Sequence, residues 1–217
     1  MIKTALLVGC GSKSGLELTK SFLDAGYIVD LITGTSVELP VRSCVVDWEA
    51  LNPSHIESFL KGRDHYDTIV FNQNARVLEP TCYTANRFNT LDLWKTDKLW
   101  NQAYYNNCIL PFHIIHTLAS RCNTNTKVLW MLSELIYNHK PGIGYADYIG
   151  HKYQNYVLMK NFSQNHTATF AGINRGKIPL DPKDLLDFLE YSSAGINGRV
   201  FYSNGTEDEN FNFKANQ

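Results

Sequence analysis

A tyrosine and a lysine stand four positions apart in the segment Tyr148-Ile149-Gly150-His151-Lys152. Residues four apart share one face of a helix, so Lys152 is expected beside Tyr148. An ammonium group near a phenol favours the phenolate and lowers the phenol pKa from its ordinary value of about 10. Such a phenol can give a proton to an oxygen of a bound substrate or take one from it. The pair is therefore a candidate acid/base, with Tyr148 as the group that exchanges the proton.

The same spacing occurs again in Tyr156 and Lys160. The four positions advance by fours and form one stripe along a helix. Tyr156 lies about 12 Å along the axis from Tyr148, at a rise of roughly 1.5 Å per residue, so one site cannot use both pairs. Gly150 is small and leaves room for a cofactor beside the first pair. We predict that the first pair is functional and that Tyr156 packs in the core.

Glycines cluster directly after an apolar run, in Gly9-Cys10-Gly11-Ser12-Lys13-Ser14-Gly15. The run Thr4–Val8 is typical of a buried parallel strand, and the spacing of apolar residues over Gly15–Ala25 predicts a helix. In a strand–turn–helix unit, glycines let the chain turn tightly and approach a pyrophosphate, while the helix N-terminus presents free N–H groups to it. The cluster therefore predicts a dinucleotide-binding turn. A Walker-type loop is excluded, because it ends in Gly-Lys-Ser/Thr and Lys13 here precedes Ser14-Gly15.

Strand-like runs alternate with helical stretches along the chain, which predicts a parallel sheet with helices on both faces. The expected strands are Thr4–Val8, Tyr27–Thr33, Ser43–Val46, Asp67–Phe71, Lys127–Leu132, Thr167–Ile173 and Arg199–Ser203. The expected helices are Gly15–Ala25, Pro53–Lys61, Thr90–Ser120 with a kink or break at Pro111, Tyr145–Asn161 and Pro182–Tyr191. The polar stretch Glu207–Gln217 is expected to be loose. Residues 1–217 are predicted to form a single α/β domain, a doubly wound parallel sheet of about seven strands with a Rossmann fold.

Several segments, taken in order, resemble the signatures of the short-chain dehydrogenase/reductase family, and the resemblance covers the chain almost end to end. The matching segments are Gly11-xxx-Gly15-Leu16, Asp47 after the third strand, Asn72-Gln73-Asn74-Ala75, Asn107 ahead of Pro111-Phe112, Ser133 fifteen positions before Tyr148, the YxxxK pair Tyr148 and Lys152, and Ile196–Phe201 with Gly205 beyond it.

This resemblance implies an NAD(P)(H)-dependent oxidoreductase that transfers a hydride between nicotinamide and a small carbonyl or alcohol substrate. It implies that Tyr148 is the acid/base, Ser133 binds the substrate oxygen, Lys152 also holds the nicotinamide ribose and Asn107 orders a water chain that feeds Lys152. It implies a homodimer or homotetramer, since the family commonly pairs the helices that carry Asn107 and Tyr148. The expected cofactor-binding residues are Gly9, Gly11, Ser12, Lys13, Gly15, Leu16, Thr33, Thr35, Asp47, Asn74, Ala75, Tyr148 and Lys152.

Four positions depart from the family pattern. They are Cys10 for a threonine, Glu17 for the third glycine, Arg76 for a glycine and Arg175-Gly176 for a Pro-Gly pair. We interpret Glu17 as a residue that stabilises the start of its helix through the helix dipole. Arg175 can contact a phosphate or an anionic substrate, but we favour the interpretation that it is an exposed surface arginine. The segment from Gly176 to Pro182 is short where the family has a longer substrate-covering loop, which predicts an open site.

These departures keep a second hypothesis open, a catalytically weak or silent dinucleotide-binding protein that senses redox state or acts as a scaffold. A third, a sugar epimerase or dehydratase of the extended family, ranks last. It needs a larger C-terminal substrate region than Lys177–Gln217.

The end of the second strand indicates the cofactor. An acidic residue there binds the ribose hydroxyls of NAD and repels a 2′-phosphate. The segment Thr33-Gly34-Thr35-Ser36 contains no carboxylate, and Lys13 can meet a 2′-phosphate through a charge-assisted contact. We predict NADP(H) rather than NAD(H).

Composition restricts the partners and the compartment. A net charge of −1 gives no long-range attraction to nucleic acid or to an anionic membrane, so neither is an expected partner. The N-terminus lacks the zones of a signal peptide, and the five scattered cysteines have no CxxC spacing, so we expect a cytoplasmic protein without disulfides or structural zinc. His113 and His116 share a helix face without an apparent third ligand. We expect them to serve helix packing and predict no metal.

Overall fold

The computed structural model describes residues 2–46, 53–73, 101–138, 146–175, 180–192, 194–202 and 204–211. In this part of the chain, seven strands form one parallel sheet in the order β3-β2-β1-β4-β5-β6-β7. The strands are β1 (Thr4–Val8), β2 (Ile28–Thr33), β3 (Arg42–Val45), β4 (Thr68–Phe71), β5 (Lys127–Leu132), β6 (Thr169–Asn174) and β7 (Val200–Tyr202). The predicted doubly wound α/β fold is confirmed.

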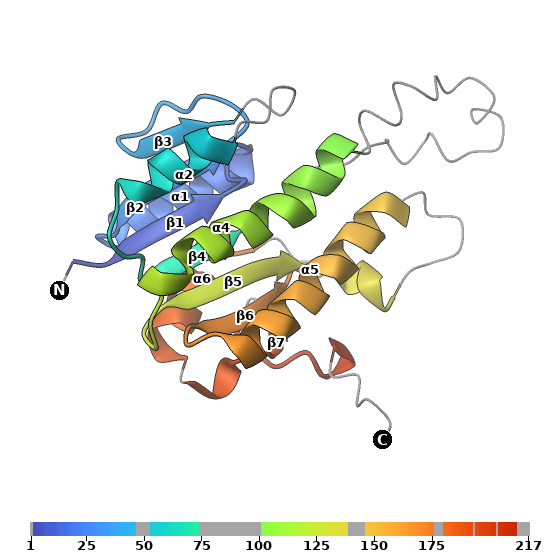
Figure 1. Cartoon of the computed structure of the whole chain (residues 1–217). Helices are drawn as coiled ribbons and strands as arrows, with labels where there is room; N and C mark the ends of the chain where they lie inside the picture. Colours follow the sequence, from blue (N-terminus) through green and yellow to red (C-terminus); the bar gives the residue numbers. More distant parts are fainter. Residues whose placement is uncertain are drawn as a thin grey trace.

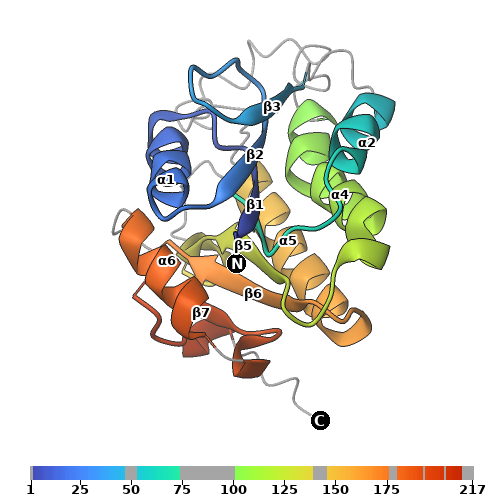
Figure 2. The ribbon, with the colours of Figure 1, turned by 90° about the vertical axis from the view of Figure 1, so that its left-hand side faces the viewer.

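Helices cover both faces of the sheet (Figures 1 and 2). Their bounds are α1 (Lys13–Asp24), α2 (Pro53–Lys61), α4 (Leu110–Leu118), α5 (Ala146–Asn165) and α6 (Pro182–Tyr191). Helices α1 and α6 lie on one face, and α2, α4 and α5 lie on the other, as the view along the sheet shows (Figure 2). Within the described residues, no helix has the length and apolar character needed to cross a membrane.

Two apolar cores result from the alternation of strand side chains. Leu6 and Val8 of β1 point into the core under α2, α4 and α5, while Ala5 and Leu7 point into the core under α1 and α6. Because both faces of β1 are buried, its sequence is continuously apolar rather than alternating. This explains why the run Thr4–Val8 was a reliable strand signal.

The strand order reverses between β1 and β4. From β1 the chain builds outward through β2 and β3, and then returns to β4 on the other side of β1. The connections that leave the carboxyl ends of β1 and β4 therefore run in opposite directions and leave a crevice between them. Ligands of such sheets bind at this point, so the residues that follow β1 and β4 are placed to contact a ligand.

The long helix predicted over Thr90–Ser120 is described from residue 101. Residues 101–104 are helical, and a π-helical turn, η3 (Tyr105–Ile109), then precedes α4. The Leu110 N–H donates to the Tyr105 carbonyl five residues back. Proline has no N–H with which to continue the i to i−4 pattern, so the interruption lies just ahead of Pro111, close to the predicted break.

The expectation that Glu207–Gln217 is loose is wrong for residues 207–211. Asp208 and Phe211 are fully buried, and a 3₁₀ turn, η7, spans Glu209–Phe211. The Phe211 ring packs against the rings of Tyr137 and Tyr156, and the Tyr156 hydroxyl donates to the Phe211 carbonyl at 2.7 Å. One aromatic side chain in a polar segment is enough to fix it when a gap in the core receives the ring.

Candidate functional site

A cavity of about 460 Å³ opens beside the reversal point of the sheet. Five residues predicted to bind a cofactor line it, namely Gly9, Gly11, Ser12, Thr33 and Thr35. The other lining residues are Ser14, Gly34, Asn72, Gln73, Asn106 and Arg175. The cavity thus joins the glycine-rich turn after β1, the end of β2 and the residues that follow β4.

The glycines keep one wall of this cavity as bare backbone. Gly9 has a φ of +80°, and a Cβ there would lie 2.7 Å from Cα of Gln73. A Cβ on Gly11 would collide with the hydroxyl of Thr33 and lie 2.7 Å from the hydroxyl of Thr35. A side chain at either position would collide with these neighbours, so both positions require glycine, and the turn forms a cradle of main chain that a phosphate can approach.

The start of α1 follows this cradle. Ser12 caps the helix, with its Oγ accepting a hydrogen bond from the Gly15 N–H at 3.3 Å. Gly15 is buried against the backbone of Cys10, and the Leu16 N–H donates to the Ser12 carbonyl at 2.8 Å. Lys13 is exposed, and none of Lys13, Gly15 and Leu16 lines the cavity. These three residues shape and orient the turn.

Two of the departures from the family pattern lie within the described residues near the glycine-rich turn. Glu17 is exposed on α1, but the first turn of this helix contains no acidic residue, so the interpretation of Glu17 as a residue that stabilises the helix start through the dipole is wrong. Cys10 is fully buried, and burial raises the pKa of its thiol to about 12. Such a thiol stays protonated and packs as a small apolar residue.

Lys152 anchors α5 to the carboxyl edge of the sheet. Its Nζ donates to the carbonyl of Gln73 at 2.8 Å and to the carbonyl of Met131 at 2.7 Å. Only 4% of Lys152 is exposed, so these two carbonyls compensate for much of the hydration that its ammonium loses. The same Nζ lies 5.7 Å from the centroid of the Tyr148 ring. Lys152 thus connects the Tyr148 ring to Gln73 of the cavity wall, although neither Tyr148 nor Lys152 is itself among the residues that line the cavity.

Asn107 and Ser133 lie on neighbouring elements. Asn107 is buried in η3, and its Nδ2 lies 3.3 Å from Nδ1 of His151, the residue before Lys152 on α5. Ser133 directly follows β5, and its Oγ accepts a hydrogen bond from the Leu135 N–H at 3.3 Å. The four residues of the predicted catalytic set thus come from η3, β5 and α5, which converge at one edge of the sheet.

The second YxxxK pair is structural, as predicted. Tyr156 is buried against Phe211, and the Nζ of Lys160 donates to the carbonyl of Gly198 at 2.9 Å. The two side chains thus contact the C-terminal segment and the turn before β7. His113 and His116 differ from expectation, since both are exposed on α4 rather than packed between helices. Three predicted cofactor residues, Asp47, Asn74 and Ala75, lie outside the described residues, as does Arg76.

Sequence reasoning missed several residues of the cavity. Gln73 is 3% exposed and Asn106 is half-buried, and within the described chain neither Nε2 of Gln73 nor Oδ1 of Asn106 has a hydrogen-bond partner. Buried polar atoms are nearly always paired, so an unpartnered donor and an unpartnered acceptor on two residues that line one cavity fit a polar ligand there. The adjacency of Asn106 to Asn107 was the signal available for it. Arg175 is half-buried and lines the same cavity, so it is not the freely exposed surface arginine that we favoured, and its contact with an anion stays a prediction.

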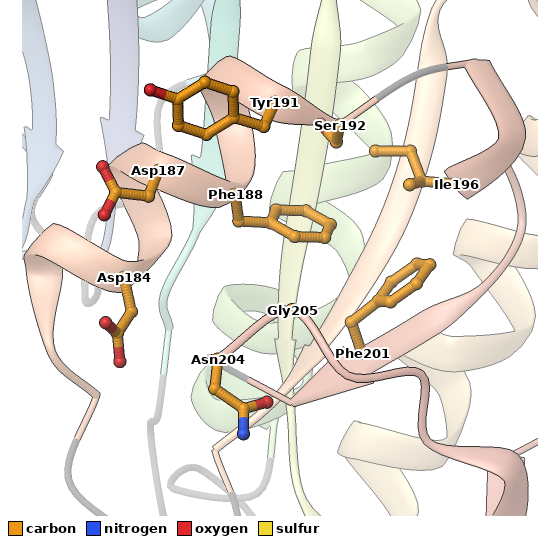
Figure 3. A pocket seen from close by; sticks show the side chains of 9 residues that line it. All are labelled: Asp184, Asp187, Phe188, Tyr191, Ser192, Ile196, Phe201, Asn204 and Gly205. Atoms are coloured by element: carbon orange, nitrogen blue, oxygen red, sulfur yellow. The ribbon is translucent and has the colours of Figure 1, made fainter.

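A second cavity, of about 470 Å³, lies between α6 and β7. Figure 3 shows the side chains of Phe188, Ile196 and Phe201 on one side of it and the carboxylates of Asp184 and Asp187 on the other. The two phenylalanine rings lie 5.2 Å apart, between centroids, and belong to the core under α1 and α6. None of the residues predicted for the site lines this cavity.

Solved structures with the same fold cover almost the whole chain. A short-chain dehydrogenase/reductase from Serratia marcescens is 15% identical over 94% of this chain and 97% of its own, with a TM-score of 0.69. An oxidoreductase of the short-chain dehydrogenase/reductase family from Brucella ovis, in complex with a partially ordered NAD, is 15% identical over 93% and 99%, with a TM-score of 0.65. A short-chain dehydrogenase from Shigella flexneri, complexed with NADP, is 11% identical over 93% and 96%, with a TM-score of 0.68. No family model and no curated protein matches the sequence.

Proposed function

We propose that this chain is an NAD(P)(H)-dependent oxidoreductase of the short-chain dehydrogenase/reductase type, acting on a small carbonyl or alcohol. The observation that carries the proposal is the position of Lys152. Its ammonium donates to the carbonyl of Gln73, which lines the cavity, and lies 5.7 Å from the centroid of the Tyr148 ring on the same helix as Lys152. The fold shared with proteins of this type supports it.

The residues present fit a dinucleotide. The glycine cradle and the N-terminus of α1 suit a diphosphate, which needs close main-chain approach and positive potential. The open Nε2 of Gln73 and Oδ1 of Asn106 suit the hydroxyl and amide groups of such a ligand. When bound, a nicotinamide cofactor supplies or accepts the hydride.

The chain's own residues then handle the proton and the orientation of the substrate. Tyr148 gives a proton to the carbonyl oxygen, or takes one from the alcohol, and Lys152 favours its phenolate form. Ser133 donates a hydrogen bond to the same oxygen and fixes its position. Asn107, coupled to His151, supports the geometry of α5 next to Lys152.

The preference of the site is proposed to be NADP(H). The hydroxyls of Thr33 and Thr35 line the cavity at the end of β2, where no carboxylate opposes a 2′-phosphate. Lys13 is exposed at the first position of α1 and is available to pair with that phosphate.

One observation favours a second candidate, a dinucleotide-binding protein without turnover. Lys152 already donates two hydrogen bonds to main-chain carbonyls, and this could restrain the ammonium in a structural role. The two candidates share the cofactor site and differ only in chemistry.

Two measurements separate these candidates. Fluorescence titration with NADPH and NADH tests the cofactor site, and we expect tighter binding of NADPH. Consumption of NADPH over a panel of aldehydes, ketones and quinones then tests turnover. Binding without consumption of any substrate would favour the silent protein, and the absence of binding would exclude both.

A further inference from the structure

Arg175 directly follows β6, the strand next to β5 in the sheet. The parallel register pairs Leu132 with Asn174, so Ser133 and Arg175 leave adjacent strands at the same level. The Arg175 side chain nevertheless lines the cavity that also contains Gly9, Gly11 and Ser12, at the end of β1. Its guanidinium thus extends from the predicted substrate side toward the glycine-rich turn.

Among the described residues that line the cavity, Arg175 is the one with a charged side chain. The positive charge of Arg175 also acts on the glycine-rich turn. Burial raises the pKa of the Cys10 thiol, and the Arg175 guanidinium lowers this pKa in part. The cavity therefore has positive potential from two directions, the N-terminus of α1 and Arg175, and it favours an anion.

A third feature fits the same ligand. Gln73 lines the same cavity and is almost fully buried, and its buried Nε2 has no hydrogen-bond partner among the described residues. The three groups are N–H donors, and an ionised phosphate has acceptors for all of them. An adenosine moiety or a nicotinamide ring alone does not match this set of donors.

We propose that Arg175 binds the diphosphate of the dinucleotide, from the side opposite the glycine-rich turn. This inference rests on the proposed function and adds one residue to those that bind the cofactor. The planar guanidinium can donate two parallel hydrogen bonds to two phosphate oxygens, a bidentate geometry that a lysine ammonium does not present. Binding then depends on the diphosphate itself and weakens as salt concentration rises.

An acidic substrate also presents an anion that Arg175 can bind. The experiment therefore distinguishes the diphosphate of the cofactor from an anionic group of the substrate. ADP-ribose contains the diphosphate but lacks nicotinamide, and adenosine lacks both. Binding of ADP-ribose, adenosine and NADPH is measured by calorimetry for the wild type, Arg175→Gln, Arg175→Lys and the control Lys20→Gln. Lys20 is exposed on α1, so its substitution changes net charge equally without touching the cavity.

We expect Arg175→Gln to weaken ADP-ribose and NADPH by the same factor, about 10- to 100-fold, and to leave adenosine unchanged. Arg175→Lys should give a smaller loss, and Lys20→Gln none. Equal affinities for ADP-ribose in the wild type and Arg175→Gln would overturn the inference, and a rise in KM for an acidic substrate alone would assign the residue to substrate instead. If Arg175→Gln does not fold, the comparison of Arg175→Lys with the wild type decides. Wild-type protein that binds no nicotinamide nucleotide would contradict the proposed function itself.

Discussion

The hydroxyl of Tyr137 donates a hydrogen bond of 2.9 Å to Oδ2 of Asp208, 71 positions further along the chain. The same oxygen accepts from Nδ2 of Asn174 at 2.6 Å, and Oδ1 accepts from the main-chain and side-chain nitrogens of Asn210. Asp208 is fully buried. This carboxylate therefore ties the C-terminal segment to the end of β6 and to the turn after β5.

Asp208→Ala should destabilise the fold strongly, because it removes the acceptor that the half-buried Tyr137 hydroxyl and the buried Asn174 amide share. We expect a loss of about 1–3 kcal/mol in the free energy of unfolding, measured by urea denaturation. Glu190→Ala, at an exposed position of α6, is the control and should change stability little. A neutral effect of Asp208→Ala would show that this network does not hold the segment.

Tyr148→Phe should lower turnover about 10²- to 10⁴-fold, because the proton donor is lost, while NADPH affinity stays nearly unchanged. Tyr156→Phe is the matched variant on the same helix. It removes the hydrogen bond to the Phe211 carbonyl and should cost about 1 kcal/mol of stability without affecting turnover. Steady-state kinetics and thermal unfolding of both variants check the assignment, and unchanged turnover in Tyr148→Phe would refute it.

Lys13→Gln should weaken NADPH binding about fivefold, the effect of one exposed charge pair, and leave NADH binding unchanged. Lys20→Gln serves as the control on the same helix. Fluorescence titration of the wild type and both variants with NADPH and with NADH gives the affinities needed. Equal losses for NADPH and NADH would mean that Lys13 does not contact a 2′-phosphate.

Stability should fall in acid through Asp30. Burial raises the pKa of this carboxyl, but hydrogen bonds from Arg42, Arg63 and Tyr66 outweigh burial and hold the pKa at about 2. Because the folded pKa lies below the unfolded value of about 3.9, the contribution is complete above the unfolded pKa and is lost as pH falls toward 2. It amounts to about 2–3 kcal/mol.

Asp30→Asn tests this effect. The variant should be less stable at pH 7 and should lose less stability than the wild type between pH 5 and pH 2, in urea denaturation at each pH. If the free energy of unfolding falls equally with pH in both proteins, Asp30 is not the cause of the acid sensitivity.

The predicted homodimer or homotetramer has a candidate surface on α4 and α5. Phe112, Tyr153 and Val157 are 44%, 50% and 47% exposed there, and the two helices lie side by side (Figure 1). Val157→Asp should shift the protein to monomer in light scattering, because a charge is placed in a desolvated contact. Tyr191→Asp, on α6, alters a side chain that is 80% exposed and should not change the assembly.

The sheet and most helices were predictable because their signals are local. The run Lys127–Leu132 is apolar because both of its faces are covered, and Asp181 caps the helix that begins at Pro182 with bounds identical to the prediction. The cavity residues of the glycine turn were predictable for the same reason, since a turn between a strand and a helix is a local pattern.

Residues whose roles depend on distant contacts were not predictable. The sequence left two readings of Arg175, a surface residue or an anion contact, and the fold alone shows that it shares a cavity with Gly9, Gly11 and Ser12, more than 160 positions earlier. Phe211 reads as part of a polar tail until Tyr137 and Tyr156 pack against its ring. The nearby sequence does not show which distant residues meet either side chain.

The π turn at Tyr105–Ile109 inserts one residue into an otherwise regular helix. Each residue of an α-helix contributes about 100° of rotation. Deleting one residue between Asn106 and α4 would therefore turn Asn106 by that angle relative to α4. Asn106 would then leave the cavity wall, although no amino acid in the cavity had been replaced. A change of length by a single codon could therefore rearrange this pocket, and surveys of natural variation should examine gaps at this helix as closely as substitutions.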